Sequence, residues 1–308
     1  ADTNAKAVTL LTELRADRAA AVTAFGLISG PSAAQVASYN KAIAAWDAAI
    51  DAVDGTAGTD ATKSTTSAVN RIRITFTGSG QTDNGLSYGA TIRADQAAAG
   101  NTGTLGTQWV EGAFGRVTMG DVDGADEWAV GDVDGVGLAG LGFHNEMTYQ
   151  SVEHDLGWSY GAQGLTVGVS MDTSVTSGSN MAYGASYTVA VEGVGVTAGV
   201  GKSDVGTASQ TSMGVSATMA GLSATMIHSA DDNGTAADVD ETALSVSYNM
   251  NALTATVFQK DVATTGAADV NYQGVGIAYD LGGATAKLGV MRDDADLQTI
   301  DAGISFSF

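Results

Sequence analysis

From Val69 to Phe308, apolar and small polar residues alternate in almost every segment of this 308-residue chain. A period of 2 is the pattern of β-strands whose two faces meet different surroundings. In the first such segment Ile72, Ile74 and Phe76 share one face, while arginine and threonine take the other. Forty-one glycines against a single proline fit many strands joined by tight turns. The chain from Val69 onward is therefore predicted to be all β.

The second face of these strands consists of glycine, serine and threonine, as in Thr166, Gly168 and Ser170. A water-soluble sandwich would cover its outside with lysine and glutamate. A small, weakly charged face suits a wetted lumen instead, with the apolar face turned to lipid. Short turns also alternate with longer polar loops, as at the two rims of an outer-membrane barrel. We predict a transmembrane β-barrel. A secreted or surface-layer β-rich structural or adhesin protein without a pore is the alternative.

About fifteen strands can be recognised, and sixteen antiparallel strands are expected because single-chain bacterial barrels have an even number. Residues 1–68 differ from the rest, since two amphipathic segments around Gly30-Pro31 predict an α-helical hairpin followed by a Gly/Ser/Thr linker. We expect the missing strand before Ala1, which makes the hairpin an insertion in the first external loop of a barrel formed by residues 69–308. If Ala1 is the true terminus, part of residues 1–68 closes the barrel instead.

Composition argues against several classes of function. The net charge of −21 would repel the phosphates of nucleic acid. The absence of cysteine excludes disulfides and thiolate metal sites. The sequence contains no run of 18 apolar residues, so it predicts no transmembrane helix. The three histidines are dispersed, and no Ser–His–Asp arrangement or phosphate-binding loop stands out. We therefore expect no enzyme and no required cofactor.

The main interruption of the alternation is residues 121–150, which are rich in glycine and aspartate and follow neither a strand nor a helix period. A structureless loop of this length inside a compact domain is uncommon and usually functional. We predict that this loop folds inward and narrows the barrel.

Charged residues on the two sides of this loop form a candidate pore constriction. Its basic members lie on the polar faces of the preceding strands: Arg71, Arg73, Arg93 and Arg116. Its acidic members lie on the loop: Asp121, Asp123, Asp126, Glu127, Asp132 and Asp134. Opposite charges across a narrow channel create a transverse field that orients water and dipolar solutes. The acidic excess predicts mild cation selectivity. Solvated or locally paired surface arginines are the alternative.

The motif Gly-Asp-Val-Asp-Gly occurs at residues 120–124 and again at residues 131–135. Oxygen-rich loops of this kind can bind calcium, so a structural calcium ion at four aspartates is a candidate: Asp121, Asp123, Asp132 and Asp134. The spacing does not match an EF-hand, and plain solvated carboxylates are the favoured alternative.

The chain ends in Ile304-Ser305-Phe306-Ser307-Phe308, which resembles the assembly signal of outer-membrane barrels. Together with residues 112–121, 71–90 and 274–283, this end resembles the general diffusion porins of alphaproteobacteria, the Rhodobacter type. The resemblance covers about residues 69–308, and the helical hairpin departs from it. It implies a sixteen-stranded homotrimer in the Gram-negative outer membrane, surrounded by lipid and lipopolysaccharide. Small hydrophilic solutes and ions would cross it by passive diffusion.

Overall fold

The computed structural model describes residues 70–97, 100–103, 106–138, 145–150, 154–174, 180–234, 237–294 and 297–307, preceded by residues 66–68 and five single positions. The chain divides into two units, Ala1–Val69 and Asn70–Phe308. The helical hairpin predicted for residues 1–68 lies almost wholly outside the described residues. The second unit carries the fold.

This second unit is one antiparallel sheet. Its fifteen wall strands each pair with the next wall strand along the chain, and the short strand β3 pairs only with β2, outside this order. The all-β barrel predicted from the sequence is confirmed, with fifteen strands in the path. The sixteenth strand was expected in or before residues 1–68, outside the described part. The strands are β1 (Ile72–Gln81), β2 (Ser87–Ala97), β3 (Gly100–Gly103), β4 (Thr107–Gly112), β5 (Gly115–Val122), β6 (His154–Ala162), β7 (Leu165–Met171), β8 (Asn180–Val191), β9 (Val194–Val205), β10 (Ala208–Met219), β11 (Leu222–Asp232), β12 (Val239–Met250), β13 (Leu253–Thr264), β14 (Val270–Asp280), β15 (Ala284–Asp293) and β16 (Gln298–Phe306).

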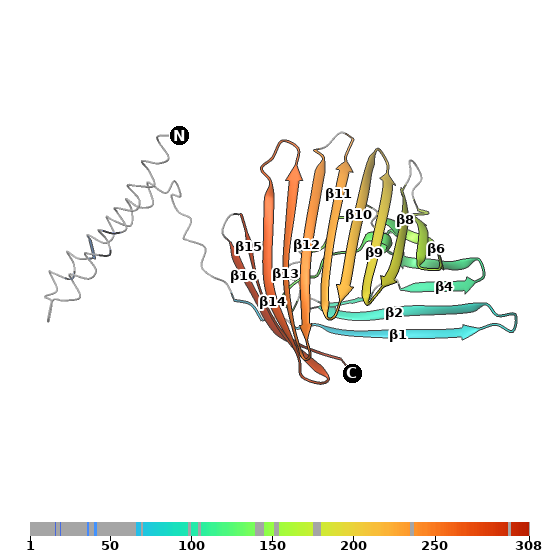
Figure 1. Cartoon of the computed structure of the whole chain (residues 1–308), viewed down its shortest axis with the longest axis horizontal. Coiled ribbons are helices and arrows are strands. Elements are labelled where there is room, and N and C mark those ends of the chain that lie inside the picture. The colour runs from blue at the N-terminus through green and yellow to red at the C-terminus, as the bar shows by residue number, and fades with distance from the viewer. Residues whose placement is uncertain are drawn as a thin grey trace. The chain divides into compact units, whose positions relative to one another are not determined.

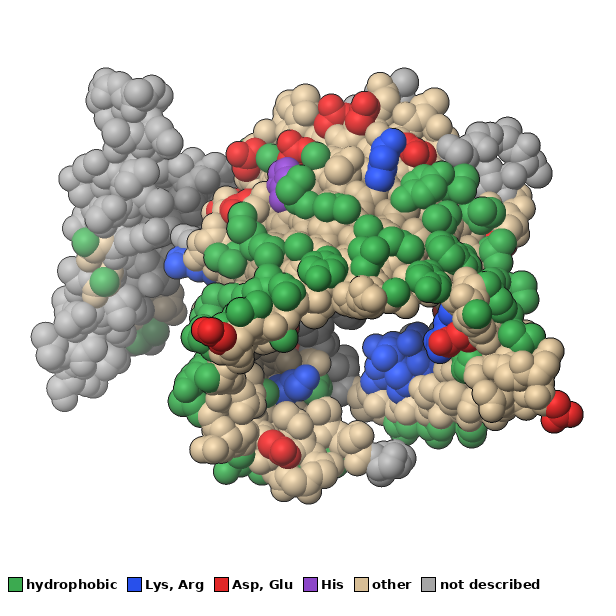
Figure 2. Space-filling view, turned by 45° about the vertical axis from the view of Figure 1, so that its right-hand side comes forward, with side chains coloured by type: hydrophobic (Ala, Val, Ile, Leu, Met, Phe, Trp, Pro, Cys, Tyr) green, Lys and Arg blue, Asp and Glu red, His purple; other side chains and the backbone are tan. Residues whose placement is uncertain are grey.

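The apolar face of the sheet points outward. Phe76, Val275 and Ile300 are 60%, 55% and 64% exposed, and many equivalent apolar side chains on other strands are similarly exposed. In a soluble sandwich these residues would form the core. Figure 2 shows hydrophobic side chains gathered in a band across the outside of the wall, with acidic ones toward one edge. This face is the one suited to lipid.

The two rims of the sheet differ in their connections. Four of the described hairpins close with two residues that both have positive φ, as in the type I′ turn that matches the strand twist. These are Gln163-Gly164, Glu192-Gly193, Ala220-Gly221 and Gly282-Gly283. Longer connections, such as that between β11 and β12, lie at the other rim. The asymmetry expected from the sequence is therefore present.

The structure differs from the sequence-based expectation at the long loop. Residues 121–150 were expected to lack secondary structure, but a six-residue helix, α3 (Ala125–Val130), lies within them. Asp126 and Glu127 in its first turn favour it through the helix dipole, yet six residues are too few to show a helical period. In Figure 1 the sheet curves around α3, which lies against β7–β10. Among the described residues, no helix has the length and apolarity needed to cross a bilayer.

Candidate functional site: the inward loop and the wall beneath it

The loop that follows β5 runs across the inner face of most of the wall. In its first half, three backbone N–H groups of the loop donate to side chains on successively later strands. They are Ala125 N to Ser170 Oγ on β7 (2.7 Å), Asp134 N to Ser245 Oγ on β12 (2.9 Å) and Leu138 N to Asp301 Oδ2 on β16 (2.6 Å). After residues 139–144, which are not described, the loop returns to β10, where Gln210 Oε1 accepts from Gln150 N. The described part of the loop is therefore bonded to strands from β7 to β16.

Glycines on the inner face let this loop lie directly on the sheet. A methyl group at Gly184 on β8 would overlap the carbonyl oxygen of Ala125, and one at Gly199 on β9 would overlap that of Ala129. An added methyl group would also come too close to loop atoms at four other glycines of the inner face: Gly201, Gly276, Gly289 and Gly303. The glycine-rich polar face of the strands is therefore the seat of the loop.

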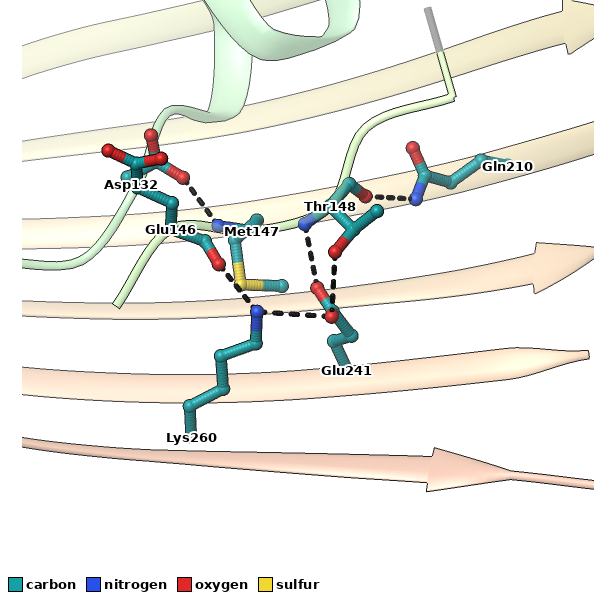
Figure 3. A network of polar contacts seen from close by, with 7 residues as sticks. All are labelled: Asp132, Glu146, Met147, Thr148, Gln210, Glu241 and Lys260. Atoms are coloured by element: carbon teal, nitrogen blue, oxygen red, sulfur yellow. Dashed lines mark hydrogen bonds and ion pairs between the residues drawn. The ribbon is translucent and has the colours of Figure 1, made fainter. Parts of the chain in front are cut away.

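A buried ion pair fastens the returning part of the loop (Figure 3). Lys260 Nζ on β13 lies 3.0 Å from Glu241 Oε1 on β12, and both side chains are 6% exposed. Glu241 also accepts from the backbone N and the hydroxyl of Thr148, at 2.8 and 3.0 Å. Lys260 donates to the carbonyl oxygen of Glu146. Buried charges are tolerated only when they are paired and hydrogen-bonded in this way.

Two apolar clusters fill the space between loop and wall. Loop side chains Val133, Met147 and Tyr149 pack on Ile227 and Ala243 of the wall. Further along, Val136 packs on wall side chains Phe258 and Met291. The hydrophobic core of this protein thus lies inside the barrel, between the loop and the strands beneath it.

A serine and a histidine meet at the start of the loop without forming a reactive site. Ser170 Oγ accepts from Ala125 N and is also hydrogen-bonded to His154 Nδ1, both at 2.7 Å. The other ring nitrogen, Nε2, donates to Asn180 Oδ1 at 2.8 Å, because an amide oxygen can only accept. Ser170 and His154 are 0% and 2% exposed, so no substrate can reach them. Their role is to hold the loop.

The predicted acidic residues have different surroundings, although Asp123, Asp126 and Asp132 lie near enough to Glu127 to raise its pKa. Asp126 is fully buried, and a methyl group at Gly201 would lie 2.6 Å from its Cα. Asp132 Oδ1 accepts from Met147 N at 2.6 Å, and Asp134 Oδ2 accepts from Ser247 Oγ at 2.6 Å. All of the predicted acidic residues except Asp126 are exposed or half-exposed: Asp121, Asp123, Glu127, Asp132 and Asp134. Because Asp126 is buried, it can influence ions in the lumen only through its electrostatic field.

The carboxyl of Glu127 has an unusual acidity. Its pKa is raised from 4.5 to about 7, first by burial and then, in decreasing order, by the neighbouring carboxylates of Asp123, Asp132, Asp126 and Glu146. Among the described residues, no group of three or more His, Cys, Asp and Glu side chains is placed to hold a metal ion. Calcium at the four aspartates stays a prediction from the sequence.

Two of the predicted arginines share one face of the first hairpin. Arg73 lies opposite Asp95, and Arg93 lies opposite Thr75, so the two arginines are diagonal neighbours about 7 Å apart. Arg71 directly precedes β1. The face is the inner one, because the residues that alternate with these, Ile74 and Phe76, lie on the exposed apolar outer face. Figure 2 shows Lys and Arg side chains gathered beside an opening in the molecule.

Arg116 lies apart from this group. Its guanidinium is 2.6 Å from Glu111 Oε2 and 4.3 Å from the centre of the Trp109 ring. Arg116 pairs with Glu111, which pairs with Ser87 at the turn end of β2. Arg93 is six residues further along that strand, about 20 Å away. The structure therefore places Arg116 near the short-turn rim, in a local ion pair.

Sequence reasoning missed the wall residues that hold the loop: Ser170, Gln210, Glu241, Lys260 and Asp301. A signal for some of them existed. Glu241, Lys260 and Asp301 are charged residues on a strand face that otherwise carries mainly glycine, serine and threonine. A charge at such a position needs a partner, but the sequence does not show that the partner is the loop.

A wall that is apolar outside, with a loop folded against its inside, defines an outer-membrane barrel of the porin class. The chain matches the sequence model of the Gram-negative porins over residues 19–298 and belongs to that family. Its place is the outer membrane of a Gram-negative bacterium.

Individual relatives agree with this assignment. A porin of Rhodobacter capsulatus is 35% identical over 135 residues, which cover 39% of this chain and 45% of that porin, so the match spans less than half the length of this relative. A porin structure refined at 1.8 Å resolution has a TM-score of 0.63 at 24% identity, covering 77% of this chain and 92% of the other. A triple mutant of the Rhodopseudomonas blastica porin has a TM-score of 0.56 at 18% identity, with 77% and 90% covered. The two structures show a common fold.

Replacing Gly184 with alanine should push the loop off the wall, because the added methyl group meets the Ala125 carbonyl. Overpacking of this kind costs about 1–3 kcal/mol. We expect a lower unfolding temperature in detergent and faster proteolysis within residues 121–150. Gly161→Ala is the matched control, since its methyl group would have no neighbour closer than 3.7 Å. Equal behaviour of the two variants would contradict the glycine seat.

Replacing Lys260 with methionine should leave Glu241 buried without its cation and destabilise the protein by about 3–5 kcal/mol. Adding Glu241→Gln should recover much of that loss. The exposed pair of Lys202 and Asp204, 3.0 Å apart, provides the control, since Lys202→Met should cost under about 1 kcal/mol. Thermal unfolding in detergent measures all three. A Lys260 variant as stable as the Lys202 variant would exclude the ion pair as a fastening of the loop.

Proposed function

We propose that this porin lets small hydrophilic solutes and ions diffuse passively through a water-filled lumen that the inward loop narrows. The observation that carries the proposal is the seating of the loop backbone on the inner face of β7–β16. A loop bound along so much of the wall takes up lumen volume permanently. The wall formed by β1, β2, β4 and β5 then provides the other side of the passage.

The charges on the two sides support selective passage. Arg73 and Arg93 lie on the inner face of β1 and β2, and exposed carboxylates such as Asp123 and Asp132 lie on the loop. Opposed charges across a narrow channel favour polar solutes, because an apolar solute would displace oriented water without replacing its hydrogen bonds. The net charge of −21 favours cations over anions. The proposed pore is mildly cation-selective, requires no cofactor and performs no enzymatic reaction.

We propose a homotrimer on the basis of the wall height. A tilted strand needs about 9–11 residues to cross a bilayer, but β4 has 6 residues and β5 has 8. Strands β8, β9, β10, β12 and β13 have 12 each. Beside these short strands, Phe76 on β1, Ile92 on β2 and Met119 on β5 line a concavity of about 900 Å³. A low, concave, apolar part of the wall suits contact with other copies of the chain rather than lipid.

The purified protein should produce stepwise conductance in planar bilayers, with steps grouped in threes for a trimer. In a salt gradient, replacing Arg71 and Arg73 by glutamine should shift the reversal potential toward greater cation selectivity. The reason is that fewer fixed guanidinium charges then repel the permeating cations. Arg116→Gln is the control, since its guanidinium is already paired with Glu111 near the rim. The absence of conductance would refute the pore. An unchanged reversal potential would remove these arginines from the constriction.

Cation selectivity should rise as the pH rises through about 7, because the Glu127 carboxyl then loses its proton. Because the pKa of Glu127 is raised in the folded protein, the stability that its protonated carboxyl contributes is fully present below pH 4.5. This contribution is lost as the pH rises through about 7. Reversal potentials and unfolding temperatures from pH 5 to 9 measure the two effects. Glu127→Gln should abolish both changes near pH 7. A variant that keeps the wild-type pH profile would assign the titration to another group.

A further inference from the structure

Trp128 is a large aromatic residue of α3 that stays open to water inside the barrel. The helix backbone faces the wall, since the carbonyl oxygens of Ala125 and Ala129 lie against Gly184 and Gly199. The indole of Trp128 extends from the helix over the inner face of β6 and β7, and it is 40% exposed. Aromatic rings placed in this way are typical of sites that bind small molecules.

Two glycines of the wall give this ring a flat support. A methyl group at Gly157 on β6 would overlap the Trp128 ring, and one at Gly168 on β7 would lie 3.2 Å from its Cε3. The wall therefore covers one face of the indole and leaves the other face to the lumen, and we call this surface the Trp128 platform. Because the start of α3 is hydrogen-bonded to Ser170, the platform is in place before any solute arrives.

Three hydroxyl groups of the wall surround the Trp128 platform. Thr118 lies directly opposite Gly157, and Ser159 lies directly opposite Gly168. Thr166 lies two residues from Gly168 on the same face of β7, about 7 Å away. In the described part of the chain, no other residue is hydrogen-bonded to any of these three hydroxyls, so each is available to a solute.

The wall beside the platform also offers room for a solute. Ser159 borders a concavity of about 270 Å³ that continues toward the rim of the short turns. This volume is close to the lower end of the range for small-molecule sites, about 300–1,000 Å³, and suits a solute with a single ring. Short turns are periplasmic in outer-membrane barrels, so the concavity lies on the periplasmic side of the loop.

We propose that the Trp128 platform and its three hydroxyls form a binding site for a neutral pyranose sugar in the lumen. The inference rests on the proposed passage, because a sugar reaches the site only through the lumen. In β-glucopyranose every hydroxyl is equatorial, so each face of the ring presents C–H groups and the hydroxyls lie at its edge. The C–H face packs on the indole, whose π-face carries partial negative charge. The hydroxyls at the edge meet those of the wall, which both donate and accept.

The charges near the platform favour a neutral sugar over a phosphorylated one. Glu127 is next to Trp128 in α3 and lies near enough to Asp123 and Asp132 for their carboxylates to raise its pKa. A phosphate would be repelled by these carboxylates. An organic cation would be attracted to them and to the indole face, so choline is the competing ligand in the test.

Saturation-transfer NMR of the full chain, purified in a detergent without a sugar head group, measures binding independently of conduction. The probes are methyl β-glucopyranoside, sorbitol and choline. The glucoside should bind saturably, with the strongest transfer to the C–H protons of one ring face. Sorbitol has similar hydroxyls but no ring, so it should bind at least about tenfold more weakly. In planar bilayers the glucoside should lower the conductance toward a plateau, whereas sorbitol should lower it only in proportion to its concentration.

Trp128→Ala should lower the affinity for the glucoside about tenfold, and Trp128→Phe should lower it less, because a phenyl ring keeps part of the platform. Trp158→Ala is the matched control, since Trp158 is 37% exposed but lies on the outer face of β6. It should bind the glucoside as wild type does. Thr166→Val keeps the shape of the side chain and removes one hydroxyl, so the affinity should fall about fivefold. Heat-dependent mobility on electrophoresis shows whether each variant is folded.

Several results would overturn the proposal. Equal affinity of Trp128→Ala and wild type would exclude the platform, as would equal losses in the Trp128 and Trp158 variants. Equal binding of sorbitol and the glucoside would show that the sugar ring is not recognised, and binding of choline alone would make the ligand an organic cation. Conductance without glucoside binding would refute the site and leave the passage intact. Glucoside binding without conductance would support the site and refute the passage.

Discussion

The close approach of the loop backbone to the sheet backbone is the contact on which the inside of this protein depends. Glycine at positions such as Gly184 and Gly199 removes the side-chain layer that would otherwise hold the loop away. The loop can then use its own N–H groups to bond wall side chains, among them Ser170 and Asp301. Because a wet lumen offers no hydrophobic interior of its own, the loop also supplies the apolar side chains that make one.

Polar groups inside the barrel divide into two kinds. Those between loop and wall, such as Glu241 and Lys260, are buried and satisfy one another, so they determine where the loop lies. Those on the inner face of β1 and β2, such as Arg73 and Arg93, belong to the opposite wall. The same residue types thus serve attachment on one side and the proposed passage on the other, and burial decides between the two.

The outer face follows a different physical rule, because lipid replaces water. Apolar side chains there remain exposed without cost, and polar side chains mark the level at which the membrane ends. On the long-loop side of β13–β16 a row of polar side chains occupies that level, namely Gln259, Gln273, Arg292 and Gln298, which lie directly opposite one another on neighbouring strands.

The sequence by itself determined the wall. A period of 2 from β1 to β16, with glycine, serine and threonine opposite the apolar residues, specified the strands and their two faces, because these depend only on local alternation and turn chemistry. Only the tertiary structure decided how the loop is held. The partners Glu241 and Thr148, or Asp301 and Leu138, are far apart in the chain, and no local period records which of them meet. It also separated Arg116 from Arg73 and Arg93, because the register of neighbouring strands places side chains at different heights on one face.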